Sequence, residues 1–428
     1  MRREMGVFSR KDTVMKRAPA FMIAILVVIF ASTQMISADA EQKIEKEFEA
    51  KRGGTLELDI GTGGEIVIIG WDKETIRVYA TVEGRDAEDF EIDFDEGSKR
   101  LEIETDYRGR GSKSCDVGME IMVPEEYDIL IDSNGGSVSI DNVAGLFKGK
   151  TMGGDIELRS LKGEVRLTTY GGDITVEESK LDGRVKTMGG DITIRDVEGD
   201  IKGFSMGGEV EYDNVSSNEK SRGEDVSITT MGGDIDVDYA GKNVKAKTFG
   251  GDVEVDRGEE VHVLTLGGDI DVQDAPRGAK VKTLGGDITI HSAGIFTKAS
   301  TMGGDIQIDA IDGWIEASTM GGDVTVIMVG DPGERERRVE LKSMGGDIEL
   351  TVPKGLSMRF DIELAITKGA KREYTITSDF DMDIEKSDKW VRRWGQKRKY
   401  IYGTGEVRGG KHLIKLRTTN GNITIREG

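Results

Sequence analysis

Short runs of alternating apolar and polar residues fill most of this 428-residue chain, and glycine pairs interrupt them. In residues 185–187 and 192–194 the side chains alternate between two faces, which is the period of a strand with one buried side. Glycines recur about every nine residues in this part of the chain, at Gly163, Gly172, Gly183, Gly190 and Gly199. The pattern excludes helix and predicts coils of two strands joined by two tight turns, where glycine can adopt positive φ angles.

The sequence Thr-Met-Gly-Gly-Asp-Ile, with small variations, recurs eleven times from Thr151 onward. Its acidic position falls at Asp155, Asp173, Asp191, Glu209, Asp234, Asp252, Asp269, Asp287, Asp305, Asp323 and Asp347. Most steps are 18 residues, and the two long steps of 25 and 24 residues contain insertions at 216–223 and 330–338. Such regularity is typical of a solenoid, in which each unit buries its apolar edge only against its neighbours.

The sequence therefore predicts an all-β fold, a single-stranded β-helix or β-solenoid with coils of about 18 residues. We expect four parts: residues 1–40 as a signal peptide, 41–132 as a β-rich N-terminal cap, 133–353 as the regular Gly-Gly-Asp solenoid, and 354–428 as irregular terminal coils and a cap. Residues 133–138 look like the first coil, and residues 419–425 look like the last. Caps cover strand edges that would otherwise promote aggregation.

Stacked coils bring equivalent residues together at the strand spacing of about 4.8 Å, which produces ladders of like side chains. Isoleucine and valine after the glycine pair should form the core, and a threonine or serine ladder should precede each turn. A bulky apolar ladder lies beside it, at Met188, Met206, Met231, Phe249, Leu266, Leu284, Met302 and Met320. Thioethers bind Cu(I), but Phe249 and Leu266 have none, so we interpret this ladder as apolar filling of the turn.

The first forty residues have the order of a secretory signal. Basic residues, including Lys16 and Arg17, precede an apolar stretch of 12 residues at 20–31, and a small-residue site follows at 38–40. The stretch is shorter than the roughly 20 residues that a membrane-spanning helix needs. We expect cleavage after Ala40 and export to the periplasm or the cell surface. The alternative is an uncleaved N-terminal helix that anchors the protein.

The composition is acidic, rich in glycine and poor in aromatic residues. The formal net charge is −21, and removal of residues 1–40, which carry +3, would make it −24. A balance of this sign disfavours nucleic acid and anionic lipid surfaces, and it favours cations or cationic partners. The single cysteine, Cys115, excludes an internal disulfide and a thiolate zinc cluster.

The acidic ladder allows two interpretations. Carboxylates about 4.8 Å apart repel each other by roughly 0.9 kcal/mol even in water, so the ladder needs compensation. Calcium could provide it, and its candidate ligands are Asp155, Asp173, Asp191, Asp234, Asp252, Asp269, Asp287, Asp305, Asp323 and Asp347. The calcium-binding nonapeptide, however, has a second Gly-x-Asp that this repeat lacks.

The second interpretation of the ladder is structural. Each aspartate would bond the backbone of its own turn, as aspartates in turns commonly do. Each would also meet an outward lysine, the candidates being Lys186, Lys247, Lys282 and Lys342. We favour this interpretation and expect that the protein needs no cofactor.

Catalysis has little support in the sequence. The three histidines, His262, His291 and His412, fall on different coils and outside any recognisable nucleophile or metal motif. β-Helix enzymes that cleave polysaccharides use paired carboxylates, but among 80 acidic residues such a pair arises by chance. We therefore expect no enzymatic activity.

Residues 389–402 form the sole basic and aromatic concentration in the acidic chain. Tryptophan, tyrosine and arginine are enriched at binding hot spots, so this segment is a candidate partner-binding site. Its candidate residues are Trp390, Arg392, Arg393, Trp394, Tyr400 and Tyr402. The alternative is that the rings plug the final coil while the basic groups offset the carboxylates of residues 379–385.

Five features occur in a characteristic order along the chain. They are the Gly70-Trp71-Asp72 turn, the Val123-Pro124 step, the Asn134-Gly135-Gly136 turn, the serial Gly-Gly-Asp-Ile turns and the closing Thr419-Asn420-Gly421-Asn422-Ile423. Together they resemble the bacterial putative-adhesin family of unknown function, also called Toastrack, from roughly Ile44 to the C-terminus. The resemblance implies a single-stranded β-helix displayed outside the cytoplasm and associated with adhesion or envelope-stress systems. It supplies no catalytic residues.

The sequence thus predicts a non-catalytic, adhesin-like binding or spacer module of the bacterial cell envelope. Envelope polysaccharide or a surface protein would be its partner, and nucleic acid would not. Two alternatives stay open: a component of an envelope-stress sensing assembly that acts through a membrane-protein partner, and a carbohydrate-active β-helix enzyme. Release of new reducing ends would indicate the enzyme, whereas retention on envelope polymer without turnover would indicate the adhesin.

Overall fold

The computed structural model describes residues 40–109, 115–216, 226–370, 372–393 and 395–428. The chain divides into two compact units, Met1–Ala38 and Asp39–Gly428, and all described residues belong to the second. The expected signal peptide therefore lies outside the described residues, apart from Ala40, where the first strand begins. The described part of the chain holds no helix with the length and apolar character of a membrane span.

Short strands account for most of the described residues, and they fall into three groups along the chain. The first group is β1 (Ala40–Glu49), β2 (Gly54–Ile60), β3 (Gly64–Trp71), β4 (Thr75–Gly84), the 3-10 helix η1 (Ala87–Asp89), β5 (Phe90–Glu96), β6 (Arg100–Tyr107), β7 (Cys115–Pro124) and β8 (Tyr127–Ser133). The second group, which holds the Gly-Gly-Asp repeats, is β9 (Val138–Asp141), β10 (Ala144–Thr151), β11 (Ile156–Arg159), β12 (Lys162–Thr169), β13 (Ile174–Glu177), β14 (Lys180–Lys186), β15 (Ile192–Glu198), β16 (Ile201–Phe204), β17 (Val210–Ser216), β18 (Val226–Thr229), β19 (Ile235–Val237), β20 (Val244–Lys247), β21 (Val253–Arg257), β22 (Glu260–Leu264), β23 (Ile270–Ala275), β24 (Gly278–Lys282), β25 (Ile288–Ala293), β26 (Phe296–Ser300), β27 (Ile306–Ile311), β28 (Trp314–Ser318), β29 (Val324–Met328), β30 (Val339–Lys342) and β31 (Ile348–Val352). The third group is β32 (Met358–Thr367), β33 (Ile376–Ser378), β34 (Asp383–Lys386), β35 (Val391–Arg393), β36 (Gln396–Val407), β37 (His412–Thr419) and β38 (Ile423–Glu427).

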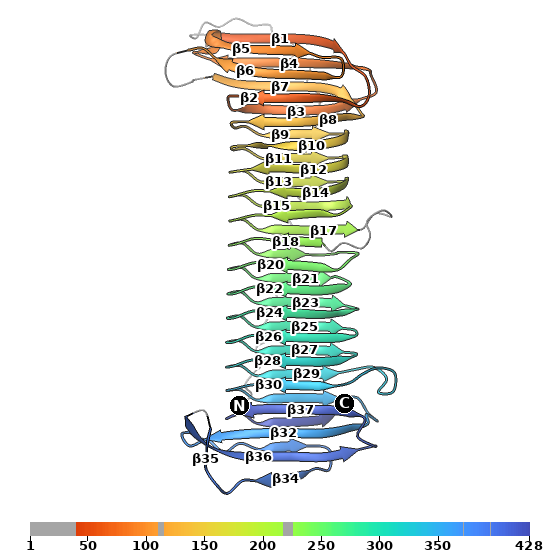
Figure 1. The fold of residues 1–428 in the computed structure, drawn as a ribbon, viewed down its shortest axis with the longest axis vertical. Helices are drawn as coiled ribbons and strands as arrows, with labels where there is room; N and C mark the ends of the chain where they lie inside the picture. The colour runs from red at the N-terminus through yellow and green to blue at the C-terminus, as the bar shows by residue number, and fades with distance from the viewer. Residues whose placement is uncertain (1–39, 110–114, 217–225, 371, 394) are drawn as a thin grey trace, which may run out of the picture. The chain divides into compact units, whose positions relative to one another are not determined.

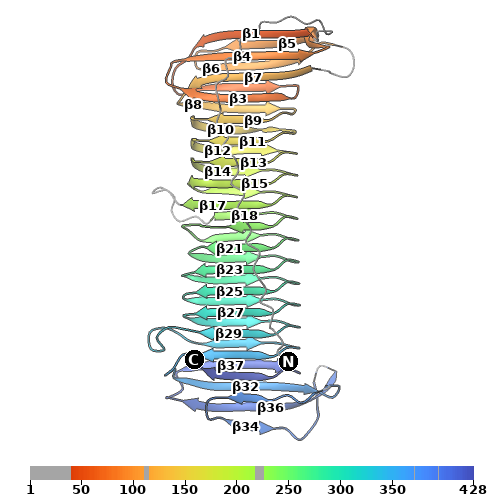
Figure 2. The same ribbon diagram turned by 180° about the vertical axis from the view of Figure 1, so that it is seen from behind.

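Two long sheets, parallel along most of their length, run through the described residues (Figures 1 and 2). The first sheet contains the odd-numbered strands from β9 to β31, and the second contains the even-numbered strands from β8 to β30. Within these two ranges each strand pairs with the next strand of its own sheet, so Ile156 faces Ile174, which faces Ile192, at intervals of 18 residues. Successive strands thus belong to different sheets, an all-β arrangement that is consistent with a β-solenoid.

Isoleucine and valine side chains make up most of the core of this stack. In neighbouring strands of the two sheets, Val281, Ile288 and Ile290 are at most 2% exposed. Burial of apolar surface stabilises a fold by about 25 cal/mol per Å², and here every coil contributes the same few inward positions. Because each coil contacts only its neighbours, the stability of one coil depends on the two beside it.

The parallel stack begins earlier in the sequence than we expected. β2 pairs with β8 and β3 with β9, so residues 54–71 form the coil next to residues 127–141. In the segment between them, β6 is parallel to β2 and β7 is parallel to β3, while β4 is antiparallel to β1 and β7, and β5 is antiparallel to β6. Residues 133–138 are therefore not the first coil, because β2 with β3 and β6 with β7 already stack in parallel before them.

The C-terminal strands also depart from sequence order. β37 and β38, which contain the expected last coil, pair directly with β30 and β31. On their other side they pair with β32 and β33, and β32 is antiparallel to β36. The chain thus passes beyond the position of its last coil and returns to fill it, so residues 419–425 do not form the outermost coil.

Candidate functional site

Each Gly-Gly-Asp turn is tied to the turn of the neighbouring coil through its aspartate. The Oδ1 atom of Asp155 accepts a hydrogen bond from the backbone N–H of Asp173 at 2.9 Å, and Asp173 accepts one from Asp191 at 2.8 Å. The same bond links all successive ladder residues from Asp234 to Asp347, at 2.6–2.8 Å. Hydrogen bonds from N–H groups to a carboxylate stabilise its charge, so this arrangement offsets part of the repulsion along the ladder.

These bonds correct the expectation that each aspartate bonds the backbone of its own turn. Coils lie about 4.8 Å apart, so a short aspartate side chain reaches the next coil. The outward lysines do not compensate the ladder either, since none of them forms an ion pair with a described ladder carboxylate. Lys247 lies over the ring of Phe249, with 4.9 Å from Nζ to the ring centre, and Lys342 pairs with Glu340.

Glu209 is the one glutamate in the acidic ladder, and it shows why aspartate is preferred at this position. Its own N–H donates to Asp191 at 2.8 Å, but within the described residues its longer side chain accepts no hydrogen bond from Asp234. Burial raises the pKa of Glu209, and the nearby carboxylates of Asp191 and Asp234 raise it further. A glutamate at this position therefore carries a less well compensated charge.

Calcium binding along the acidic ladder stays a prediction. The described residues contain no group of three or more His, Cys, Asp or Glu side chains that could hold a metal ion. Calcium takes about six to eight oxygen ligands, and one oxygen of most ladder carboxylates already accepts an N–H of the neighbouring coil. A calcium ion at the ladder would therefore have to use the second carboxylate oxygens and further ligands.

A buried ladder of threonine and serine hydroxyls lies under each turn and closes it. Thr187 Oγ1 donates to the carbonyl of Gly172 on the neighbouring coil at 2.8 Å and accepts the N–H of Gly190 in its own turn at 3.1 Å. The same pair of bonds recurs at Thr283, with 2.9 and 3.3 Å. The hydroxyl satisfies one acceptor and one donor that would otherwise be buried without partners.

The bulky apolar ladder lies on the surface and does not fill the turn. Its side chains range from 37% exposed at Leu284 to 53% exposed at Met344. The members are Met152, Tyr170, Met188, Met206, Met231, Phe249, Leu266, Leu284, Met302, Met320 and Met344. The hydroxyl ladder and the close-packed glycine backbones occupy the inside of the turn. The apolar side chains therefore form an exposed stripe next to the acidic ladder.

The C-terminal aromatic residues divide between packing and surface positions. Tyr400 is 5% exposed, whereas Trp390 and Tyr402 are 42% and 39% exposed. The rings of Tyr400 and Tyr402 stack with 5.8 Å between their centres, and Lys399 Nζ lies 5.3 Å from the ring centre of Trp390. One ring therefore fits the expected packing role, and the two others lie at the surface.

The basic members of the same segment are described only in part. Arg392 is exposed in β35, which pairs with β36. Trp394 and the side chain of Arg393 lie outside the described residues. Whether this segment binds a partner therefore stays a prediction.

The three histidines lie on β22, β25 and β37, and each has its own partner. His262 Nε2 is 2.7 Å from Glu260, and His291 Nδ1 is 2.8 Å from Asp309. His412 Nδ1 accepts the backbone N–H of Arg337 at 3.2 Å, and burial lowers the pKa of its ring. No two of them share a site among the described residues.

One outward surface of the first sheet concentrates carboxylates. Glu211, Asp236, Glu254 and Asp271 stack in register on consecutive strands, so no basic residue separates them along this row. Burial raises the pKa of Asp236 to about 6, and the nearby Asp238 and Glu254 contribute to the increase. We call this row, together with Asp238, the acidic face.

The raised pKa of Asp236 in the acidic face predicts that the stability of the protein depends on pH. Because the pKa of Asp236 rises from 3.8 to about 6 on folding, the folded protein binds a proton between these values that the unfolded chain does not. Stability should therefore fall as pH rises from about 4 to about 6 and stay lower at neutral pH. Asp236→Asn should raise the free energy of unfolding at pH 7 by on the order of 1 kcal/mol, since the half-buried group is partly screened.

Urea unfolding at several pH values measures this effect. Glu157→Gln is the matched control, because Glu157 lies in the same row between Ser139 and Thr175. A wild-type protein whose stability does not change between pH 4 and 7, or an Asp236→Asn variant that follows the wild-type curve, would contradict the prediction.

The outward positions of the second sheet carry the opposite charge. In the nine even-numbered strands from β10 to β26, two outward rows stack in register, one beginning at Lys148 and Arg166 and the other at Lys150 and Thr168. Of these eighteen positions eleven are basic and none is a carboxylate. We call the eleven the basic face: Lys148, Lys150, Arg166, Arg184, Lys186, Lys202, Lys245, Lys247, Lys280, Lys282 and Lys298.

The basic face could not be predicted from the net charge of the chain. Three of its members, Lys186, Lys247 and Lys282, were expected to face the acidic ladder, but they belong to rows on the second sheet. The available signal was the recurrence of lysine at alternate positions before the threonine, as in residues 245–248 and 280–283. Assigning those lysines to one surface required the register between coils.

The parallel sheets and in-register ladders define this protein as an all-β repeat protein whose coils stack on one another. The chain belongs to the Toastrack DUF4097 family, whose sequence model matches residues 24–256 and 191–379. The resemblance noted in the sequence is thereby confirmed. No curated protein matches the chain.

Three solved structures similar to this chain carry names that refer to adhesion. A putative cell adhesion protein from Clostridium sporogenes has 10% sequence identity and a TM-score of 0.17, covering 91% of this chain and 100% of that one. A putative adhesin from Bacteroides fragilis has 15% identity and a TM-score of 0.21, covering 65% and 99%. A putative adhesin from Parabacteroides merdae has 13% identity and a TM-score of 0.23, covering 68% and 97%.

Proposed function

We propose that this chain is a non-catalytic, exported binding or spacer module of the bacterial cell envelope, in the manner of an adhesin. The single observation that supports it most is the set of exposed ladders that repeat in register along the stack, because repeated side chains suit a repeating partner. Coils of about 18 residues set that repeat. Envelope polysaccharide or a surface protein is the proposed partner, and the periplasm or the cell surface is the proposed location.

The turn chemistry also supports a passive role. The hydroxyl and aspartate ladders bond one coil to the next, so the polar groups that could have formed a reactive site hold the backbone instead. The strands at both ends fit the role of caps, since β1, β4, β5 and β36 form antiparallel pairs outside the repeating part. Such caps would keep the sheets from joining other chains at their edges.

Co-sedimentation tests the proposal. We expect the exported protein to sediment with isolated envelope polysaccharide or peptidoglycan and to release no new reducing ends. The measurement is made with calcium and with chelator, because dependence on calcium would assign the acidic ladder as its site. Release of reducing ends would indicate an enzyme, and absence from every pellet would contradict the binding role.

A protein partner in the membrane is the second candidate function. The exposed rings of Trp390 and Tyr402, 42% and 39% exposed, favour it, since aromatic side chains of this kind are common at hot spots. The protein would then take part in envelope-stress sensing. A membrane protein captured by the wild-type chain and lost with Trp390→Ala and Tyr402→Ala, at unchanged stability, would favour this function over polymer binding.

A further inference from the structure

The basic face concentrates positive charge on a protein of net charge −21. Its rows follow the stack from β10 to β26, and seven of these nine strands carry at least one of the charges. Like charges about 4.8 Å apart repel each other by roughly 0.9 kcal/mol in water. A surface of this kind attracts counter-ions, and a linear polyanion is the counter-ion that can bind every coil at once.

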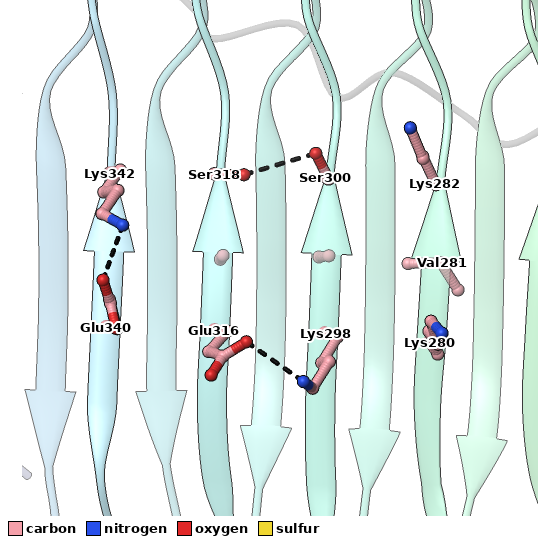
Figure 3. A pocket seen from close by; sticks show the side chains of 11 residues that line it. Lys280, Val281, Lys282, Lys298, Ser300, Glu316, Ser318, Glu340 and Lys342 are labelled. Atoms are coloured by element: carbon pink, nitrogen blue, oxygen red, sulfur yellow. Dashed lines mark hydrogen bonds and ion pairs between the residues drawn. The ribbon is translucent and has the colours of Figure 1, made fainter.

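Four members of the basic face have no carboxylate partner among the described residues: Lys148, Arg184, Lys280 and Lys282. Toward the two ends of the face, Lys150 meets Asp132 at 3.2 Å and Lys298 meets Glu316 at 3.2 Å. Figure 3 shows the contrast, with Lys280 and Lys282 extending from β24 beside the paired Lys298 and Glu316.

Three shallow grooves lie on the same face. Their volumes are about 540, 520 and 420 Å³, and lysine and arginine side chains of the two rows line all three. Carboxylates also line the first, at Asp132, and the third, at Glu316 and Glu340, whereas the second has none. Hydroxyl groups lie among the charges, at Thr168, Thr229 and Ser300. The face therefore offers cations for acidic groups and neutral polar groups for hydroxyls.

We propose that the basic face binds a linear anionic polysaccharide, laid along the stack so that successive sugars meet successive coils. This inference rests on the proposed envelope-binding function and names the partner's chemistry. Nine of the eleven basic residues are lysines, which act as mobile point charges and suit carboxylate groups of irregular orientation. Phe204 is the one aromatic residue in the two rows, so the face lacks the series of rings on which single-stranded nucleic acid stacks.

The test compares a charge-reversed face with a matched control. Lys280→Glu combined with Lys282→Glu reverses two unpaired charges that line two of the grooves. Lys51→Glu combined with Lys354→Glu makes the same change in net charge at two exposed lysines outside the face. Both variants should unfold at the wild-type temperature, because all four side chains are exposed.

The binding probes are polygalacturonate, neutral dextran and single-stranded DNA, titrated at two salt concentrations. We expect the wild-type protein to bind polygalacturonate and not dextran, with an affinity that falls as salt rises. Reversal of Lys280 and Lys282 should weaken the binding about tenfold or more and reduce its salt dependence, since fewer counter-ions are displaced. The control variant should bind within about twofold of the wild type.

Equal losses in the two variants would overturn the inference, because they would reflect net charge and not this face. Tighter binding of DNA than of polygalacturonate would overturn the assignment to polysaccharide. Sedimentation with envelope material separates this inference from the proposed function. If the Lys280 and Lys282 variant sediments as well as the wild type does, the envelope-binding role stands and the basic face is not its site. If no form of the protein sediments, the proposed function fails. The polygalacturonate titration still tests whether the basic face binds an anionic polysaccharide.

Discussion

Gly172→Ala should destabilise the stack by about 3 kcal/mol or more, whereas Gly171→Ala in the same turn should have little effect. A Cβ atom on Gly172 would lie 2.2 Å from the carbonyl oxygen of Gly154 and 2.6 Å from Oδ1 of Asp155. On Gly171 the nearest atom would be 3.7 Å away, which is an ordinary contact. The first substitution forces two backbones apart, and the second fills open space.

The predicted cost has two sources. The neighbouring backbone cannot move without shifting its whole coil, and the displaced Asp155 would lose the N–H of Asp173 as well. The second glycine of the later turns meets the same obstacle, at 2.1–2.2 Å, from Gly190 to Gly346. Each of these turns therefore requires its second glycine strictly. The first glycine has more room, although a Cβ atom would lie 3.0–3.4 Å from the neighbouring coil in the turns from Gly189 to Gly345.

Urea unfolding of the wild type and the two variants measures the difference. Hydrogen exchange then shows whether the loss stays in the coils beside residue 172, as expected where coils interact only with their neighbours. Equal midpoints for both variants would mean that the coils are not packed as closely as the structure has them.

The glycine pair shows what sequence can and cannot predict. Its period predicted the turns, the strands between them and their stacking, because period and alternation reflect local structure. The expected reason for the glycines, their ability to adopt positive φ angles, was partly wrong. Positive φ angles of 131° occur at Gly163 and Gly183, but these lie within β12 and β14, whereas Gly172 in the turn is required by close approach to the neighbouring coil. A close approach between coils is not visible in the sequence of one coil.

The bonding partners of the acidic ladder and the existence of the basic face were missed for the same reason. An aspartate in a turn can bond its own backbone or that of the next coil, and only the 2.8 Å contact of Asp191 with Asp173 separates these cases. The lysines of the basic face are spread over a sequence of net charge −21, and they meet only through the register of nine strands. Long-range pairing likewise determined that β37 and β38 lie against β30 and β31.

Arg337→Met should destabilise the insertion at residues 330–338 by roughly 3 kcal/mol, while Arg335→Met should cost less than about 1 kcal/mol. Both arginines pair with Asp312, but the side chain of Arg337 is fully buried and that of Arg335 is 44% exposed. Arg337 also donates to the carbonyl oxygens of Val329 and of Asp331, the latter at 2.8 Å.

Methionine keeps most of the apolar volume of arginine and removes its donors. Val329 and Asp331 would then lose the donors that their carbonyl oxygens have in the fold, and Asp312 would keep only the exposed Arg335. Removal of the buried partner of an ion pair costs about 3–5 kcal/mol, whereas an exposed pair contributes about 1 kcal/mol or less, which is why the loss should be large at Arg337 and small at Arg335. The comparison therefore separates burial of the guanidinium group from its charge, since both variants remove one positive charge near the same carboxylate.

The loss should be seen where β37 meets the insertion. His412 Nδ1 accepts the backbone N–H of Arg337 at 3.2 Å, so movement of the insertion would expose β37 and its partner β30. Hydrogen exchange should accelerate at residues 339–342 and 412–416 in Arg337→Met and not in Arg335→Met. If urea unfolding gives the same free energy for both variants, the buried guanidinium does not hold the insertion. In that case the packing of β32 against β37, and not Arg337, would hold this end of the stack.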